Sequence, residues 1–466
     1  MLFMKAPDNF LNLFCGLRLK MIFVLFQLMC LGLMLIQIAF AIVCPVPPPC
    51  KCTTNSGLRA YCNGLNLTEI PVFVKSGGPW NLDLSNNRIQ FVKSDAFTNI
   101  QLESLYLSNN SISYVDDGAF AGSESKIDVL HLDGNHLIAL PAALTNLPYL
   151  IGLTIQYNQM TELDEYILTN LSKSLIGISF GSKHMTSWPT SLRKLQNLLM
   201  LSVYDLPLDT FPDSAFMGFE KTLTYLEVIS TQFTNIPVSM NQLVNLNYVI
   251  LKENRFLKEI PEEIFRGLQN ITTIILQHNA LKTIPSIFKD SNKMYQVTIT
   301  SENITDITES KYPTKSQPRF NYLTITNTGL RFIPMSISNM PTITVISMAN
   351  GNISGVHSTD FKNMPALANI VLTNNPLSTI DSNALQNLTS LRYLSLDGTQ
   401  LTTVPEAVQN TKVTWINLSR TSVICTCSGL RWMKNWPRRF NTTIEGSCVN
   451  VKMTIDEFKK SIVPTC

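Results

Sequence analysis

One stretch of the chain has the spacing of a hydrolase nucleophile. Gly177-Ile178-Ser179-Phe180-Gly181 fits G-x-S-x-G, a motif in which the serine sits on a sharp turn from a strand into a helix. Here Ile178 and Phe180 have the two-residue period of a strand whose apolar side chains point inward, so Ser179 should face outward in mid-strand. We therefore predict that the protein is not an enzyme and has no catalytic residues.

A second polar grouping has the residue types of a metal site. His131 and Asp133 lie on one expected strand, and Asp83 lies two strands earlier. Zinc sites need three or four ligands that converge on one point, whereas residues on successive strands form an open row. We predict a solvated row of polar side chains, with no metal and no cofactor.

Cysteines gather in two groups of four, one near each end of the repeats described below: Cys44, Cys50, Cys52 and Cys62, and then Cys425, Cys427, Cys448 and Cys466. Each group contains C-x-C, which suits either zinc or disulfides, and four cysteines allow three pairings. Export from the cytosol would favour disulfides, each contributing about 2 to 4 kcal/mol.

The first 41 residues have the features of an export signal. Lys5, Arg18 and Lys20 precede an apolar run over residues 21–43, and Ala39-Phe40-Ala41 offers small residues for cleavage. Residues 1–41 are predicted to be a signal peptide or an uncleaved signal anchor, and only the anchor would hold the protein on a membrane. Either outcome places the rest of the chain outside the cytosol and predicts a secreted, extracellular protein.

The elements that must position these residues come from a repeat of about 24 residues with the pattern L-x-x-L-x-L-x-x-N-x-L. The first leucine-type residue of each L-x-L pair marks fifteen units: Leu82, Leu105, Leu130, Leu153, Ile178, Leu201, Leu226, Val249, Ile274, Val297, Leu323, Ile346, Ile370, Leu394 and Ile416. Such a period predicts an α/β solenoid, with a curved parallel sheet on its concave face and loops and short helical turns on its convex face.

Two further positions of the repeat have physical roles. Phenylalanine-type residues of the returning segments should form an outer apolar spine: Phe97, Phe120, Phe216, Phe265, Phe288, Phe361 and Leu385. The motif asparagine should satisfy backbone groups of the turn after each strand. Seven units have it: Asn87, Asn110, Asn135, Asn158, Asn254, Asn279 and Asn375. Local irregularity is expected where Lys183, Leu206, Glu302 or Gly351 replaces it.

The repeats and their cysteine-rich flanks resemble extracellular leucine-rich repeat proteins with cysteine-rich caps, such as slit-type guidance proteins and small matrix proteoglycans. The resemblance implies an N-terminal cap over residues 44–78, about fifteen repeats over 79–424 and a C-terminal cap over 425–466. It also implies four disulfides: Cys44 with Cys52, Cys50 with Cys62, Cys425 with Cys448, and Cys427 with Cys466. The chain is similar, more narrowly, to arthropod relatives of the non-catalytic subunit of a shrimp luciferase.

Surface chemistry limits the partners. The formal net charge is +3, which disfavours nucleic acid. Residues 431–439, R-W-M-K-N-W-P-R-R, are predicted to be a cap helix whose Trp432 and Trp436 cover the last leucine layer, with a glycosaminoglycan contact at Arg438 and Arg439 as the alternative.

Export would make nine N-x-S/T sites candidates for glycosylation: Asn66, Asn109, Asn170, Asn270, Asn303, Asn352, Asn387, Asn417 and Asn441.

The outward positions of the central strands become apolar and aromatic, and neighbouring strands bring such side chains into contact. Tyrosine and exposed apolar patches are typical of interfaces, although tyrosines lying over a sheet with no partner would give the same pattern. We predict binding of an extracellular protein, in matrix, signalling or defence, through Tyr204, Tyr225, Ile229, Tyr248, Ile250 and Ile275. The alternative is a non-catalytic subunit that stabilises a secreted enzyme.

Overall fold

A computed structural model describes residues 43–123, 126–285, 287, 293–305, 318–334, 337, 340–439 and 441–466. Its coordinates divide into two compact units, Met1–Leu130 and His131–Cys466, which are described separately. The predicted leader, residues 1–41, and Phe288 lie outside the described residues. Within the ranges described, no helix combines the length and the apolar character needed to cross a bilayer.

Unit 1 starts with a hairpin that the repeat pattern did not predict. Strands β1 (Lys51–Thr53) and β2 (Arg59–Tyr61) are antiparallel. β2 is then parallel to β3 (Pro79–Asp83), with Ala60 beside Leu82, and β3 pairs with β5 (Gln101–Tyr106). A second small sheet joins β4 (Phe91–Val92) to β6 (Tyr114–Val115). The N-terminal cap therefore extends the sheet of the first repeats.

All fifteen expected repeat strands are present. β3 and β5 carry the first two, and β7 (Val129–His131) lies where the units divide. Unit 2 contains the others, with a final strand contributed by the C-terminal cap: β8 (Gly152–Thr154), β9 (Gly177–Phe180), β10 (Met200–Tyr204), β11 (Tyr225–Ile229), β12 (Tyr248–Lys252), β13 (Thr273–Gln277), β14 (Gln296–Thr300), β15 (Tyr322–Thr326), β16 (Val345–Ser347), β18 (Asn369–Val371), β20 (Tyr393–Ser395), β21 (Trp415–Asn417) and β22 (Thr443–Glu445).

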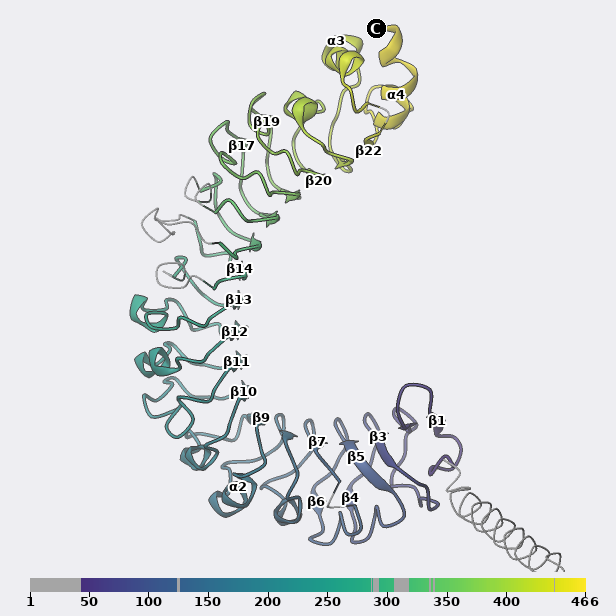
Figure 1. The fold of residues 1–466 in the computed structure, drawn as a ribbon, viewed down its shortest axis with the longest axis vertical. Coiled ribbons are helices and arrows are strands. Elements are labelled where there is room, and N and C mark those ends of the chain that lie inside the picture. The colour runs from purple at the N-terminus through teal and green to yellow at the C-terminus, as the bar shows by residue number, and fades with distance from the viewer. Residues whose placement is uncertain are drawn as a thin grey trace, which may run out of the picture. The chain divides into compact units, whose positions relative to one another are not determined.

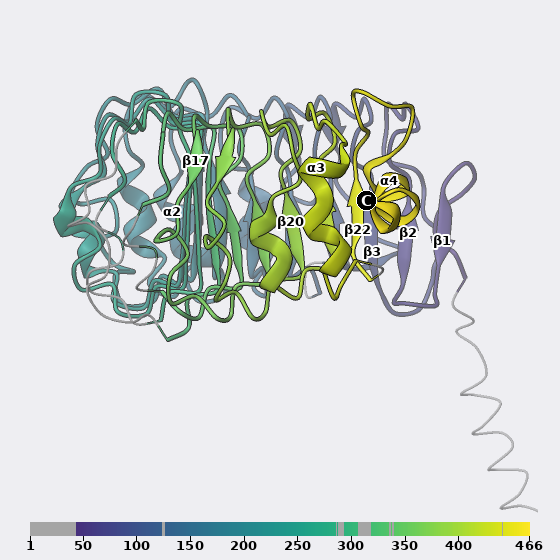
Figure 2. The same cartoon turned by 90° about the horizontal axis from the view of Figure 1, so that it is seen from above.

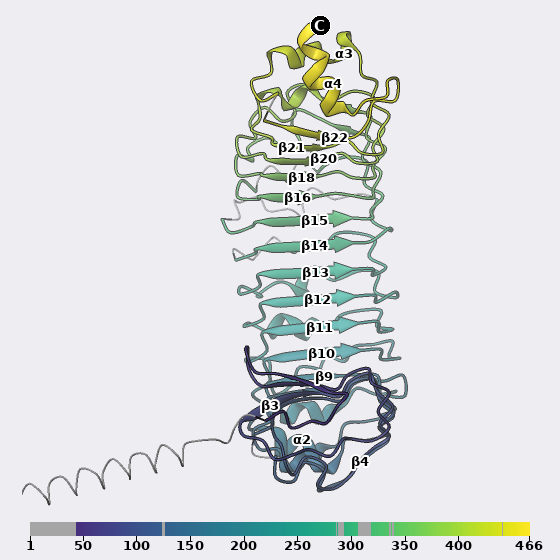
Figure 3. The same cartoon turned by 90° about the vertical axis from the view of Figure 1, so that its right-hand side faces the viewer.

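The strands of unit 2 form one parallel series (Figure 3). Within this unit they line the concave side of a curve, while the helical turns lie on the convex side (Figure 1). Leu226, Val249 and Ile274 are neighbours in register, and each is fully buried. Burial of each such side chain stabilises the fold by about 1.5 to 3 kcal/mol, which is why the leucine spacing determines the architecture.

Several returning segments of unit 2 contain short helices. One is α-helical, α2 (Glu165–Leu171); the 3-10 helices are η1 (Ala142–Asn146), η2 (Thr190–Lys194), η3 (Val238–Gln242), η4 (Glu262–Ile264) and η7 (Glu406–Asn410). A proline stands directly before each of these five 3-10 helices, where a missing backbone N–H costs no helical hydrogen bond: Pro141, Pro189, Pro237, Pro261 and Pro405. β17 (Gly355–Val356) and β19 (Thr379–Ile380) form a separate two-stranded sheet.

The outer apolar spine is present along the described chain. Its described members are at most 5% exposed: Phe97, Phe120, Phe216, Phe265, Phe361 and Leu385. In unit 2 the spine widens into an aromatic cluster, because Trp188 and Phe233 both pack on Phe211, with ring centroids 4.8 and 4.6 Å away.

The motif asparagines form hydrogen bonds with backbone groups of the preceding repeat as well as with those of their own turns. The Asn158 amide donates to Ile155 O in its own turn and to Leu132 O in the preceding repeat, both at 3.0 Å, and its Oδ1 accepts from Leu137 N at 3.0 Å. Each such side chain therefore joins two repeats, whereas the sequence predicted bonds within one turn only.

The expected irregularity occurs in two of the four units that were predicted to have it. Thirteen of the fifteen units have a residue with positive φ just before the asparagine position, such as Tyr157 and Asp205. The exceptions are the units of Lys183 and Glu302, where Ser182 and Ser301 are buried and donate to the carbonyl oxygens of Asn158 and Asn279. The units of Leu206 and Gly351 keep the regular turn, so that prediction was wrong for them.

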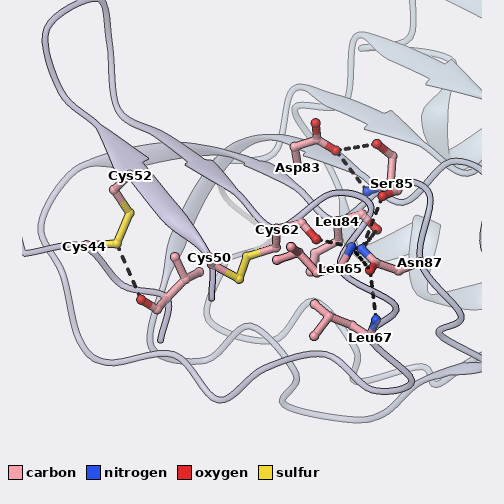
Figure 4. Close-up of a disulfide and its surroundings, with 11 residues drawn as sticks. Cys44, Cys50, Cys52, Cys62, Leu65, Leu67, Asp83, Leu84, Ser85 and Asn87 are labelled. Atoms are coloured by element: carbon pink, nitrogen blue, oxygen red, sulfur yellow. Dashed lines mark hydrogen bonds between the residues drawn. A yellow bond between two sulfur atoms is a disulfide. The ribbon is translucent and has the colours of Figure 1, made fainter. Parts of the chain in front are cut away.

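The N-terminal cap is closed by two disulfides, Cys44–Cys52 and Cys50–Cys62 (Figure 4). Asn87 of the first repeat fastens this cap to the sheet. Its amide donates to Cys62 O at 2.8 Å, and its Oδ1 accepts from Leu65 N and Leu67 N at 3.0 and 2.9 Å.

The C-terminal cap contains the disulfides Cys425–Cys448 and Cys427–Cys466. Its helical segments are α3 (Cys427–Leu430), η8 (Arg431–Asn435), α4 (Ile455–Ser461) and η9 (Val463–Thr465). α3 and α4 lie at the β22 end of unit 2 (Figures 1 and 2). All four disulfides join the cysteine pairs that the family resemblance implies.

The predicted cap helix with two covering tryptophans is only partly correct. Residues 427–435 form a short α-helix followed by a 3-10 turn. Trp436 is 2% exposed, while Trp432 is half-exposed and packs on it with ring centroids 5.4 Å apart. A 3-10 turn changes the i, i+4 alignment that an α-helix would give, so a single tryptophan covers the core with Leu430 and Met433.

Candidate protein-binding face

The six residues predicted to bind a partner lie on one face of four adjacent strands of unit 2. Register places Tyr225 of β11 beside Tyr248 of β12, Ile250 of β12 beside Ile275 of β13, and Tyr204 of β10 beside Ile229 of β11. The inward neighbours of these residues are buried leucine-type side chains, so the alternation of the strands turns all six outward. We call Tyr204, Tyr225, Ile229, Tyr248, Ile250 and Ile275, with Met200 and Glu227, the central face.

The central face is open to solvent but ordered by its own contacts. Tyr248 and Met200 are 46% and 47% exposed, and the other members are half-buried. The rings of Tyr225 and Tyr248 have centroids 6.2 Å apart. Aromatic side chains held in this way present apolar area with little conformational entropy left to lose on binding.

Three neighbouring residues were missed by the sequence prediction. Met200 of β10 is the register partner of Tyr225 on β11. Glu227 lies on β11 between Tyr225 and Ile229, beside Ser202 of β10. Tyr157, in the turn after β8, packs edge-on against Tyr204 with centroids 5.6 Å apart. Tyr157 was not predicted because it lies outside the strand positions, in a turn where its φ is +57°.

Glu227 organises the polar chemistry of the central face. The Tyr204 hydroxyl donates to Glu227 Oε2 at 2.8 Å. Burial, and then the adjacent Glu227 carboxylate, raise the pKa of Tyr225 to about 12. The same two causes raise the pKa of Tyr204. Both phenols therefore stay neutral hydrogen-bond donors at physiological pH.

Gly181, which follows β9, lies in close contact with the backbone of Tyr204. Its φ is +143°, and a Cβ built on it would lie 1.7 Å from the backbone oxygen of Tyr204. The second glycine of the G-x-S-x-G match is thus required for close approach of two backbones, not for a nucleophile elbow. Ser179 faces outward in mid-strand on β9, half-buried.

Replacement of Gly181 by alanine should lower the free energy of unfolding by at least about 2 kcal/mol, because the Tyr204 backbone must move. Gly177→Ala is the matched control, since its nearest neighbour would be Met200 Cβ at an ordinary 3.6 Å. Urea unfolding of both variants measures the difference. Equal stabilities would show that the close approach is not required.

The other polar candidates form hydrogen bonds with neighbouring residues of their own units. In unit 2, His131 Nδ1 and Asp133 Oδ1 both bond to the Thr154 hydroxyl, at 3.0 and 2.6 Å. In unit 1, Asp83 accepts from the backbone and the hydroxyl of Ser85. Among the described residues, no three His, Cys, Asp or Glu side chains converge as metal ligands.

The sequons lie outside the central face. Seven of the nine asparagines are exposed, and Asn270 and Asn417 are half-buried. No sequon falls between residues 171 and 269, a stretch that contains β10, β11 and β12. Glycans at these sites would therefore not be attached to β10, β11 or β12.

Sequence comparisons identify the repeats. A leucine rich repeat model matches residues 81–137, 341–401 and 367–423, and a model of the BspA type leucine rich repeat region matches residues 209–330. No curated protein matches the sequence.

Structure comparisons find the same architecture at low sequence identity. A leucine-rich repeat protein of Leptospira interrogans superposes with a TM-score of 0.53 at 17% identity, covering 77% of this chain and 95% of its own. A chain of the Drosophila Toll–Spatzle complex gives 0.55 at 12%, covering 80% and 66%. A chain of the mouse RP105/MD-1 complex gives 0.51 at 16%, covering 78% and 75%.

The fold defines a β-solenoid of about fifteen turns with disulfides at both ends. The matched repeats make the chain a leucine-rich repeat protein. Such solenoids are typically non-enzymatic scaffolds that bind proteins. The narrower likenesses to slit-type proteins, small proteoglycans and the luciferase subunit stay predictions from the sequence.

Proposed function

We propose that the protein is an extracellular, non-enzymatic binding module that holds a protein ligand on the central face. The observation that carries the proposal is the register-aligned row of outward aromatic and apolar side chains on β10 to β13. Exposed apolar patches with tyrosine at their centre are usually interaction sites. The Toll–Spatzle and RP105/MD-1 complexes show that chains of this fold occur with protein partners.

An extracellular location is supported by the cysteine chemistry. Four disulfides close the two caps, and disulfides persist in oxidising compartments. The nine sequons and the predicted leader fit the same location. Purification from a culture medium, with intact mass before and after deglycosylation, tests secretion, leader cleavage and glycan occupancy together.

Substitution of Tyr225, Tyr248 and Ile250 by serine should abolish capture of the partner. Loss of such central aromatic contacts typically costs 2 kcal/mol or more of binding free energy, about 30-fold in affinity. The partner is first identified by proximity labelling with the full chain in the organism's secretions, followed by mass spectrometry. Binding of the purified partner to wild type and to the triple variant is then measured.

The matched control replaces three exposed apolar residues outside the strands, Ile138, Tyr149 and Tyr166, which are 70%, 60% and 72% exposed. Both triple variants should be secreted and should unfold within about 1 kcal/mol of wild type. Capture that survives in the Tyr225 variant would rule out the central face as the binding site. A stoichiometric enzyme among the captured proteins would instead favour the non-catalytic subunit.

A glycosaminoglycan partner would have to use the basic stretch of the C-terminal cap. Arg438 and Arg439 are half-buried, and the Arg439 guanidinium donates to Lys434 O at 3.0 Å, so part of this charge is used within the cap. Salt-sensitive retention on heparin that disappears after charge reversal of both arginines would support this partner.

A further inference from the structure

Negative charge surrounds the aromatic part of the central face. Asp205, Glu253, Asp133 and Glu227 all lie close enough to Tyr157 to act on its hydroxyl; burial first and then these four carboxylates raise its pKa. They come from the turn or strand of four different repeats of unit 2. An outward sheet face that is both aromatic and acidic is complementary to a basic partner and repels an acidic one.

Two of these carboxylates already have a cation. Lys183 Nζ lies 3.9 Å from Asp205, and Lys252 Nζ lies 3.4 Å from Glu253. Glu227 differs, because within the described ranges no lysine, arginine or histidine nitrogen comes within 4.0 Å of it. Its hydrogen bonds come from neutral phenols, those of Tyr204 and Tyr225, so no cation neutralises its charge.

The neighbours of Glu227 suit one class of cation. The hydroxyls of Tyr204 and Tyr225 contact the Glu227 carboxylate. Its register partners, Ser202 and Ile250, carry no charge. A guanidinium group is planar and weakly hydrated, stacks on aromatic faces and binds a carboxylate through two parallel hydrogen bonds. A metal ion would need more ligands than this single carboxylate supplies.

We propose that the protein ligand docks through a basic segment and seats an arginine side chain on Glu227, beside Tyr204 and Tyr225. The proposal rests on the proposed function and specifies the chemistry of its partner. The exposed apolar residues Met200 and Tyr248 then receive the apolar side chains that flank this arginine.

The test uses the full secreted chain and an array of dodecapeptides, each containing arginine and each also synthesised with citrulline in its place. Citrulline keeps the shape of arginine but has no charge. Wild type should bind arginine peptides in preference to their citrulline forms. Glu227→Gln should weaken that binding about ten-fold, the effect of losing one charge-assisted contact.

Glu162→Gln is the matched control, because Glu162 is exposed and lies outside the strands while the change in net charge is identical. Equal binding of arginine and citrulline peptides, no arginine peptide bound by wild type, or equal losses in the two glutamine variants would each overturn the proposal. The proposed function fails separately, when the Tyr225, Tyr248 and Ile250 variant captures the partner as well as wild type does.

Discussion

Replacement of Asn254 by alanine should lower the free energy of unfolding by about 3 kcal/mol, because it leaves buried backbone groups unpaired. Asn254 is 1% exposed. Its amide donates to Val228 O at 3.0 Å, and its Oδ1 accepts from Thr231 N at 3.0 Å. Alanine removes both partners and opens a small cavity between two repeats. Urea unfolding, followed by circular dichroism, measures the loss.

Two further variants make this prediction specific. Asn254→Thr should cost less, because threonine fills more of this cavity than alanine does and is the residue at the same position of the preceding repeat, where Thr231 is 3% exposed. Asn383→Ala removes an exposed asparagine of an outer loop and should change stability by less than about 0.5 kcal/mol. An Asn254→Ala protein as stable as Asn383→Ala would show that the asparagine row is dispensable.

Much of the fold could be predicted because one feature of the sequence reports directly on burial. The spacing of leucine-type residues located all fifteen strands, since each pair fills the core of its own turn. The cap strands β2 and β22 were missed because R-A-Y and T-I-E are three residues long and lack an L-x-L pair. Only pairing with a neighbouring repeat makes them strands, and pairing is not visible in a local pattern.

The regular turns could be predicted from asparagine, but their exceptions could not. Leu206 occupies the asparagine position and is buried among apolar side chains, yet its turn keeps the usual positive φ at Asp205. In the units of Lys183 and Glu302 the turn is different. There Ser182 and Ser301, one residue before the asparagine position, donate to a backbone oxygen. Which residue satisfies the backbone depends on the neighbouring repeat, so a single unit's sequence cannot decide it.

The central face was predictable only in its apolar part. Alternation assigned Tyr225, Tyr248 and Ile250 to the outward side because their strands are regular. Glu227 has the same alternation as any outward polar residue, and its importance comes from the two phenols beside it. Gly181 after β9 could have indicated the close approach of another backbone, which is that of Tyr204, but no sequence signal indicated Tyr157.

The C-terminal cap depends on a buried ion pair that no sequence pattern indicated. The Lys459 side chain is fully buried, pairs with Asp456 and donates to Thr442 O. Burial lowers the pKa of Lys459, and Asp456 opposes that shift. For Asp456, burial raises the pKa, but hydrogen bonds from Lys459 and Lys460 outweigh it and hold the pKa below its ordinary value.

Asp456→Ala should therefore destabilise the C-terminal cap by about 3 to 5 kcal/mol, because it leaves a buried ammonium without its counterion. Lys460→Ala is the matched control: Lys460 also pairs with Asp456 but is 54% exposed, and loss of its exposed contact should cost less than about 1 kcal/mol.

The contribution of Asp456 to stability should also depend on pH. Because folding lowers the Asp456 pKa, the stabilisation is complete above the ordinary aspartate pKa of about 3.9 and is lost as pH falls through the folded value. Urea unfolding followed by tryptophan fluorescence should therefore separate wild type from Asp456→Asn widely at pH 7 and much less at pH 3. A gap that stayed constant with pH would mean that Asp456 acts through its shape and not through its charge.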